Sequence, residues 1–215
     1  MRPRALPRLA AALWAVACAL LLAAAPARAQ HAQDPQDADD AQGTPGVVLL
    51  RQAQAVLQPE GASVVQSTVT LTHRWDAAFP GRGGTATYRV TLPPHQGSQP
   101  MALLFTRVGN QVVATVNGAR VLARGTLGDP RYDAAKTPHL APVDAPLLHA
   151  DRPNELVVQV TVQDARWGGL SVVRYGPEAL LLKEYDTQRR WRYVASLVFC
   201  VALALLGLMA LALWA

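Results

Sequence analysis

The sequence predicts an all-β fold, an antiparallel β-sandwich that follows an export signal and precedes a membrane-spanning helix. Three observations lead to this prediction. Apolar residues recur at every second position through the middle of the chain, turn-forming residues interrupt them at short intervals, and a long apolar stretch lies near each end. A period of two is typical of strands that are buried on one face only, which antiparallel sheets allow.

Residues 1–29 have the three-part layout of a secretory signal peptide. A basic start with three arginines is followed by an apolar run over residues 10–25 and an Ala-Arg-Ala cleavage site at 27–29. An uncleaved anchor helix is the alternative, and both interpretations export the chain from residue 30. Residues 30–46 are rich in Asp, Gln, Pro and Gly and have no large apolar side chain, so we expect a disordered linker there.

Two segments show the period of two most clearly. Alternate apolar residues run from Ala86 to Leu92 and again from Leu156 to Val162, with Thr, Arg and Gln between them. Such strands have one buried and one solvated face. Asn117 and Gly118 lie between two apolar-rich arms and supply the two positive-φ residues of a type I′ turn, so they predict a hairpin.

Clusters of Gly, Pro, Asn and Asp separate further short strands from about residue 47 to residue 184, the predicted sandwich domain. Residues 125–147 are richer in Pro and poorer in strand pattern. We expect a long excursion there, with a brief strand near residues 139–143. A last strand is expected near residues 179–182.

The segment from Val194 to Ala215 has 22 residues and no charge, which is long enough to cross a hydrocarbon core of about 30 Å. Trp191, Tyr193 and Trp214 flank it as interfacial aromatics do. Residues 185–193 become a juxtamembrane connector, and residues 30–193 are expected in the periplasm of a bacterial inner-membrane protein. Three arginines in this connector oppose the positive-inside tendency, which weakens once a long domain has been translocated.

The net charge of +5 does not describe the exported domain. Residues 30–188 hold 13 basic and 15 acidic residues, a net charge near −2, because the other seven basic residues lie in the signal peptide or beside the membrane segment. A nucleic-acid surface needs clustered Lys and Arg, so nucleic acid is excluded as a partner. Both cysteines, Cys18 and Cys200, lie in the apolar end segments, so the domain has no disulfide.

The titratable residues favour no catalytic, metal or cofactor site. Most Asp residues occupy turns, where Asp bonds nearby backbone amides, and the histidines lack metal-ligand spacing. We expect ligand contacts from loop cations and aromatics instead, namely Arg131 and Tyr132 in the long excursion, and Arg166 and Trp167 before two glycines. Aromatic faces stack on sugars and Arg pairs with carboxylates, so the expected ligand is an unknown small molecule of the carbohydrate or carboxylate class.

Five motifs, in this order, resemble known domains: "LTHRWD" at 71–76, "ATYRVTLP" at 86–93, "VNGARV" at 116–121, "RPNELVVQV" at 152–160 and "GGLSVVRYGP" at 168–177. The first four resemble the jelly-roll, galactose-binding-like domain of β-galactosidase-type hydrolases. With the membrane segment, all five are similar to the periplasmic sensor domain of bacterial multi-pass receptors. Thr72 stands where the hydrolase relatives usually have Pro, and the catalytic barrel of those enzymes does not follow.

The resemblance implies a jelly-roll sandwich that senses a ligand outside the cytoplasm. It also implies a histidine kinase or diguanylate cyclase output beyond residue 215, of which this chain would be a fragment. Such receptors often act as homodimers. The alternative is a membrane-anchored carbohydrate-binding or adhesion module without signalling output. An enzyme is a third class, for which hydrolytic activity of the domain is not expected.

Overall fold

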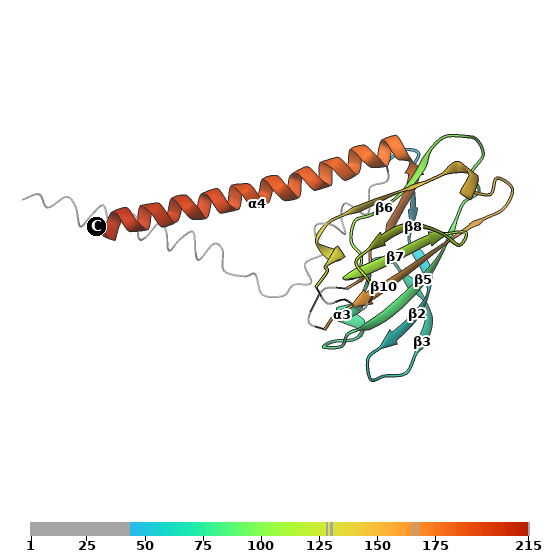
Figure 1. The fold of residues 1–215 in the computed structure, drawn as a ribbon, viewed down its shortest axis with the longest axis horizontal. Coiled ribbons are helices and arrows are strands. Elements are labelled where there is room, and N and C mark those ends of the chain that lie inside the picture. The colour runs from blue at the N-terminus through green and yellow to red at the C-terminus, as the bar shows by residue number, and fades with distance from the viewer. Residues whose placement is uncertain (1–43, 128, 130, 165, 167, 215) are drawn as a thin grey trace, which may run out of the picture. The chain divides into compact units, whose positions relative to one another are not determined.

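The strands form two antiparallel sheets, one of six strands and one of four, together with a short two-stranded ribbon (Figure 1). The computed structural model describes residues 44–214, apart from residues 128, 130, 165 and 167. The predicted signal peptide and nearly all of the predicted disordered linker lie outside the described residues. Apolar side chains of the two larger sheets form one core cluster, so the predicted β-sandwich is confirmed.

The six-stranded sheet has the order β3-β2-β5-β10-β7-β8. Its strands are β2 (Gln52–Pro59), β3 (Val65–Thr70), β5 (Gly84–Leu92), β7 (Gln111–Val116), β8 (Ala119–Arg124) and β10 (Asn154–Val162). The four-stranded sheet has the order β1-β12-β6-β9, with β1 (Val48–Leu50), β6 (Met101–Phe105), β9 (His139–Val143) and β12 (Val173–Pro177). The ribbon pairs β4 (His73–Arg74) with β11 (Gly169–Leu170).

Helical segments lie in the connections and at the end of the described chain. They are α3 (Trp75–Ala78), the 3-10 turns η1 (Ala134–Lys136) and η2 (Ala145–Leu147), and the long α4 (Glu178–Trp214). The expected excursion over residues 125–147 thus contains η1, η2 and β9. The brief strand predicted near residues 139–143 is confirmed.

The two strands with the clearest period of two are neighbours at the centre of the six-stranded sheet. β5 and β10 pair along their whole length, from Asn154 opposite Leu92 to Val162 opposite Gly84. Alternate side chains on both strands are buried, as the period predicts. Burial of one face explains why the register is well specified, since a slip of one residue would expose the whole apolar row.

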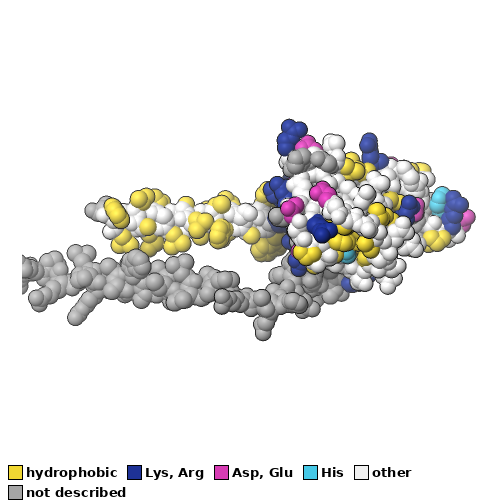
Figure 2. Space-filling view, turned by 90° about the horizontal axis from the view of Figure 1, so that it is seen from below, with side chains coloured by type: hydrophobic (Ala, Val, Ile, Leu, Met, Phe, Trp, Pro, Cys, Tyr) yellow, Lys and Arg dark blue, Asp and Glu magenta, His cyan; other side chains and the backbone are white. Residues whose placement is uncertain are grey.

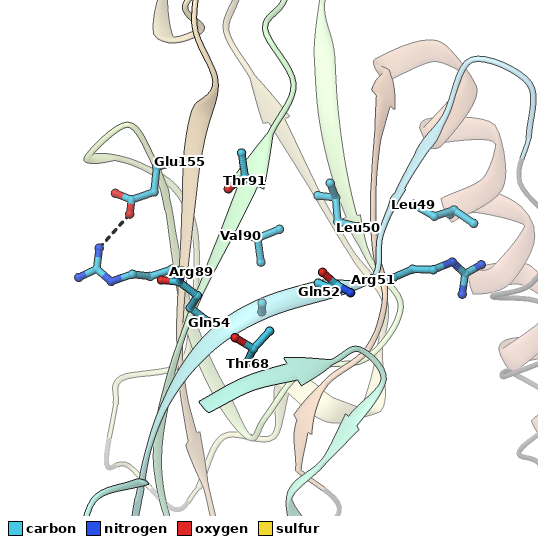
Figure 3. Close-up of a pocket in the computed structure, with 11 residues that line it drawn as sticks. Leu49, Leu50, Arg51, Gln52, Gln54, Thr68, Arg89, Val90, Thr91 and Glu155 are labelled. Carbon is cyan, nitrogen blue, oxygen red and sulfur yellow. Dashed lines mark hydrogen bonds and ion pairs between the residues drawn. The ribbon is translucent and has the colours of Figure 1, made fainter. Parts of the chain in front are cut away.

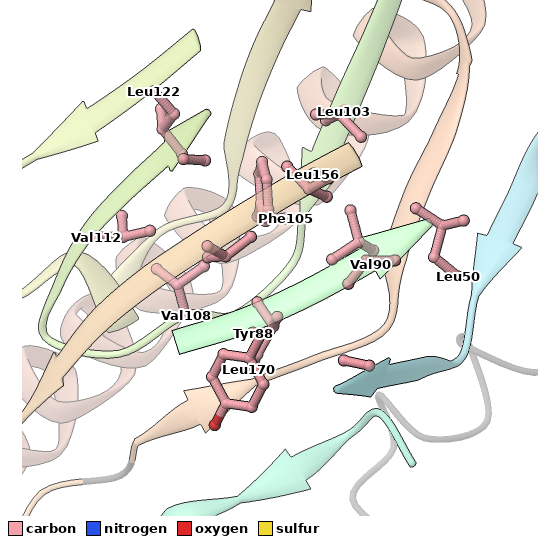
Figure 4. Close-up of a cluster of buried hydrophobic side chains, with 14 of the residues drawn as sticks. Leu50, Tyr88, Val90, Leu103, Phe105, Val108, Val112, Leu122, Leu156 and Leu170 are labelled. Carbon is pink, nitrogen blue, oxygen red and sulfur yellow. The ribbon is translucent and has the colours of Figure 1, made fainter. Parts of the chain in front are cut away.

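The core lies between the inner faces of the two sheets (Figure 4). Tyr88 and Leu156 from the six-stranded sheet and Phe105 from the four-stranded sheet are fully buried in it. Trp75 is 1% exposed, and its indole N–H donates to the carbonyl of Arg82 at 2.8 Å. Trp75 is therefore a structural aromatic of the core.

The predicted hairpin is present between β7 and β8. Asn117 has φ of +49° and Gly118 has φ of +84°, the two left-handed positions that a type I′ turn requires. The Asn117 side chain also donates to the carbonyl of Leu147 and to Oδ1 of Asn154, both at 2.7 Å. The turn is thereby tied to the neighbouring connection.

The strand predicted near residues 179–182 is wrong, because α4 begins at Glu178 and continues through the connector without a break. A short apolar run does not distinguish a strand from a helix by periodicity. Here Leu181 is fully buried against Ala102 and Leu104 of β6, while Leu180 and Leu182 are 39% and 44% exposed. The less exposed positions then recur at spacings of three and four residues, at Glu184, Tyr185 and Gln188, which fits a helix lying on the outer face of the four-stranded sheet.

From Val194 onward, the described side chains of α4 are exposed and mostly apolar, as Figure 2 shows by the yellow side chains along the helix. Among the described helices, α4 alone is long and apolar enough to cross a membrane. The sequence prediction of a membrane-type segment from Val194 onward therefore falls on one continuous helix.

Candidate ligand-binding site

A broad depression of about 580 Å³ lies on the six-stranded sheet and at the end of β1, and is called here the sheet groove (Figure 3). It is open to solvent and is lined mainly by polar side chains. Its lining residues are Leu49, Leu50, Arg51, Gln52, Ala53, Gln54, Thr68, Arg89, Val90, Thr91 and Glu155.

Strand register brings these polar side chains together. In β2, Gln52 and Gln54 are exposed and alternate with buried alanines, so both amides face solvent. Gln54 lies opposite Thr68 of β3 on one side and Arg89 of β5 on the other. The three side chains thus form a row across three strands, because cross-strand partners share a face.

An exposed ion pair forms one wall of the sheet groove. Arg89 Nη1 donates to Glu155 Oε1 at 2.9 Å, and the two side chains are 53% and 54% exposed. A pair this exposed contributes little to stability. A bound ligand could therefore exchange hydrogen bonds with either group at small cost.

The groove offers amide, hydroxyl, guanidinium and carboxylate groups, which hydrogen-bond to polyols and small polar molecules. It contains one carboxylate, Glu155, whereas glycoside hydrolysis generally requires a pair. Among the described residues, no group of three or more His, Cys, Asp or Glu could hold a metal ion.

A short structural path joins the sheet groove to α4. Leu49, which lines the groove, pairs with Arg174 of β12. Arg174 is buried, and its Nε lies 3.1 Å from Oε1 of Glu184 in α4. Its Nη1 donates to Thr106 at 2.8 Å. β12 also leads directly into α4, so a shift of β1 would reach the helix through both the chain and this ion pair.

A second depression, of about 400 Å³, lies between the long excursion, β9 and α4, and is called here the junction pocket. It is rich in aromatic and cationic side chains. Its lining residues are Arg124, Tyr132, Thr137, Pro138, His139, Leu140, Pro142, Tyr185, Arg189 and Tyr193.

His139 is the buried titratable group of the junction pocket. Burial lowers the pKa of His139 below its ordinary value of 6.5, and the nearby Arg124 and Arg192 lower it further, although a hydrogen bond to Ala134 opposes them. Nε2 lies 2.8 Å from the carbonyl oxygen of Ala134, so the neutral ring carries its proton on Nε2 and donates it there. The imidazole is thus uncharged at neutral pH.

A third depression lies between the loops that contain Asp133 and Arg166. Asn110 is fully buried, donates from Nδ2 to Asp133 Oδ1 at 3.0 Å and accepts at Oδ1 from the backbone N–H of Gln163 at 2.8 Å. Arg166 Nη1 lies 3.5 Å from Asp133 Oδ2, and Lys136 Nζ lies 3.6 Å from the same oxygen. Asn110 and Asp133 therefore tie the two loops together.

Comparisons with known proteins give structural likenesses only. No protein-family model matches the chain, and no curated protein matches it. The Ruminococcus gnavus β-glucuronidase in complex with uronic deoxynojirimycin is 13% identical over 61% of this chain, with a TM-score of 0.47. The Faecalibacterium prausnitzii β-glucuronidase is 15% identical over 64%, with a TM-score of 0.44. A GH2 β-galacturonidase from Eisenbergiella tayi bound to galacturonate is 15% identical over 61%, with a TM-score of 0.43.

This chain covers only 29%, 32% and 24% of those three enzymes, respectively. With identities under 25% and TM-scores under 0.5, the likenesses carry no argument about ligand or activity.

The structure separates the residues predicted to contact ligand. Arg131 is 89% exposed and pairs with Asp129 at 3.2 Å. Tyr132 lines the junction pocket, and Arg166 lies beside Asp133 in the third depression. Trp167 lies outside the described residues. The described members of the set thus do not share one cavity.

The sheet groove was missed by the sequence analysis, which looked for ligand contacts in loops. A signal for part of it was present, because Arg89 and Thr91 stand on the polar face of the strand predicted over residues 86–92. The neighbours of this strand could not be identified in the same way, since β2 pairs with β5 across a long sequence separation.

Proposed function

We propose that the chain is the extracytoplasmic, ligand-sensing part of a membrane receptor. In this proposal a jelly-roll sandwich binds a small polar ligand in the sheet groove, in the periplasm, and α4 spans the inner membrane after a cleaved signal peptide. A kinase or cyclase output would follow beyond residue 215. The link from Leu49 through Arg174 to Glu184 is the observation that carries the proposal, because it connects a binding surface to the apolar helix.

Signal transfer requires that the ligand favours one of two arrangements, since a ligand shifts an equilibrium only by its differential affinity for the two states. A ligand that draws Gln54 and Arg89 together would move β2 and the adjoining end of β1. β12 would follow through its pairing with β1. α4 would follow β12, because the buried Arg174 resists separation from Glu184.

The ligand class follows from the lining. Gln52, Gln54 and Thr91 suit the hydroxyls of a carbohydrate, and Arg89 suits a carboxylate once it exchanges Glu155 for the ligand. An anchored carbohydrate-binding module without signalling output would use the same groove. Such a module would not need the path to α4. A ligand-dependent movement of α4 would therefore support the receptor, and its absence would support the anchored module.

The test uses the full chain in lipid nanodiscs with an environment-sensitive fluorophore on Cys200, an exposed cysteine of α4. Sugars, uronic acids and polyols are screened by thermal shift, because a ligand that binds only the folded form raises its melting temperature. We expect a ligand that raises the melting temperature and also changes the Cys200 fluorescence. Gln54→Ala with Arg89→Ala should abolish both responses.

Glu184→Gln tests the path itself. It should keep the thermal shift and lose most of the fluorescence change. A ligand that binds the groove with no change at Cys200 in the unsubstituted protein would instead support the anchored module. If Gln54→Ala with Arg89→Ala binds that ligand normally, the sheet groove is not the site.

A further inference from the structure

We propose that the junction pocket binds the phosphate of an anionic phospholipid headgroup, a second site separate from the sheet groove. This inference rests on the proposed insertion of α4 in a bilayer. It is carried by the charge of the pocket, by the way its walls are fixed, and by its position relative to the apolar part of α4.

The pocket presents hydrogen-bond donors and positive charge. Arg124 at the end of β8 and Arg189 of α4 line it from opposite sides, and Tyr132, Tyr185 and Tyr193 add phenol hydroxyls. None of its lining residues carries a carboxylate. Several donors with two guanidinium groups suit an anion with many acceptor oxygens, and phosphate is such an anion.

Contacts from inside the sandwich fix the Tyr132 wall. Gln111, which is fully buried, donates from Nε2 to the carbonyls of Asp129 at 2.6 Å and Tyr132 at 3.3 Å. Gly125, at φ +72°, lies under the Tyr132 ring, where a Cβ atom would stand 2.7 Å from Cδ1. The loop therefore has Tyr132 in place before a ligand arrives, which lowers the ordering cost of binding.

Contacts from α4 fix the opposite wall. Arg192 Nη1 donates to the carbonyl of Lys136 at 2.6 Å and so holds the helix against the excursion. The guanidinium carbon of Arg189 lies 5.7 Å from the centroid of the Tyr193 ring, a cation–π contact that orients this arginine. Tyr185, Arg189 and Tyr193 follow one another at intervals of four residues, so they share one face of the helix.

The depth of the pocket matches the headgroup layer. Arg189 precedes Val194, the first residue of the uncharged segment, by five positions, or about 7.5 Å along a helix. Bilayer dimensions leave about 5–8 Å on each side for the polar headgroup region. A lipid phosphate would thus stand at the level of Arg189, and it would offset the positive charge that Arg189, Arg190 and Arg192 place on the exported side.

The experiment measures lipid preference of the full chain in nanodiscs of phosphatidylcholine mixed with phosphatidylglycerol, by native mass spectrometry of retained lipids. The pocket variant is Arg124→Gln with Arg189→Gln. Its matched control, Arg120→Gln with Arg190→Gln, removes the same charge from the same two elements outside the pocket lining. We expect the unsubstituted protein and the control to retain phosphatidylglycerol preferentially. In the pocket variant, the ratio of retained phosphatidylglycerol to phosphatidylcholine should fall about tenfold.

Further arms decide the other outcomes. Tyr132→Phe, which removes one hydroxyl, should give a smaller loss and serves if the double variant fails to fold. Equal preference in all variants would overturn the site, since general surface charge would then explain it. A last arm adds inorganic phosphate to the protein in pure phosphatidylcholine nanodiscs. If phosphate raises the melting temperature of the unsubstituted protein but not that of the pocket variant, and no lipid preference is seen, the pocket binds a soluble phosphate and the lipid proposal is overturned.

Flotation with phosphatidylcholine vesicles distinguishes the two proposals. A chain that does not float has no inserted helix, which overturns the proposed function and this inference together. A chain that floats but shows no lipid preference overturns only the headgroup site.

Discussion

Arg174 of β12 and Glu184 of α4 form an ion pair of 3.1 Å in which the arginine side chain is 3% exposed and the glutamate 24%. The buried guanidinium also donates to Thr106. It thus joins a central strand of the four-stranded sheet to the first turns of the helix.

Removing the carboxylate of this pair should destabilise the fold more than removing that of the surface pair. Glu184→Ala leaves Arg174 buried without this partner charge and is expected to cost about 2 kcal/mol of unfolding free energy. Glu155→Ala breaks the exposed pair with Arg89 and should cost less than about 1 kcal/mol. Urea unfolding of both variants in detergent measures the difference, and equal costs would contradict the burial of Arg174.

The docking of α4 on the sheet depends on one leucine. Leu181→Ala should leave a cavity against Ala102 and Leu104 and cost about 2–3 kcal/mol. Leu182→Ala, at an exposed neighbouring position, should change stability by less than about 0.5 kcal/mol. Hydrogen exchange should show faster exchange at the start of α4 only in the first variant. Similar exchange in both would mean that the helix is not docked there.

Gly169 should not tolerate a side chain. It has φ of +120°, and a Cβ atom there would overlap the carbonyl oxygen of His73 across the β4–β11 ribbon. Gly169→Ala is expected to cost about 2–4 kcal/mol. Gly97→Ala is the control, because Gly97 also has a positive φ, +110°, but has open space around it. Thermal unfolding should show a cost of about 1 kcal/mol for the control, and equal losses would rule out the overlap as the cause.

Acidification should weaken the fold through His139. Burial lowers the pKa of His139 in the folded state below its ordinary 6.5, so the unfolded chain binds the proton more readily. The contribution of neutral His139 to the unfolding free energy is fully present above pH 6.5. It is lost as the pH falls from 6.5 toward the lower pKa of the folded state. The charged groups that face this ring, Arg124 and Arg192, act in the same direction.

His139→Gln should flatten the dependence of unfolding free energy on pH below 6.5, because glutamine does not titrate. The remaining slope would come in part from His73, whose pKa is also lowered by burial. An unchanged slope in the variant would show that His139 does not take up a proton on unfolding. Denaturant titrations at several pH values provide the measurement.

Local signals predicted the strands around residues 86–92 and 156–162, the Asn117–Gly118 hairpin and the apolar end segment, because alternation, turn chemistry and length are each read within a few residues. The start of α4 was not predictable in this way, since the burial of Leu181 depends on β6, far away in sequence. The sheet groove was not predicted for the same reason, because its lining residues come together only when strands distant in sequence pair. Gln54 gains a role only when β2 pairs with both β3 and β5.

The unbroken course of α4 from Glu178 to Trp214 has a mechanical consequence. Under the proposed function, a helix without a hinge acts as a rigid rod, so rotation of the sandwich about the helix axis would be transmitted to the part of α4 that spans the membrane. One alanine inserted after Asp186 would turn everything beyond it by about 100° while leaving Glu184 and Leu181 in place. Under the proposed function, the rotation of α4 about its axis, more than its displacement along that axis, would then determine which face of the helix contacts other segments in the membrane.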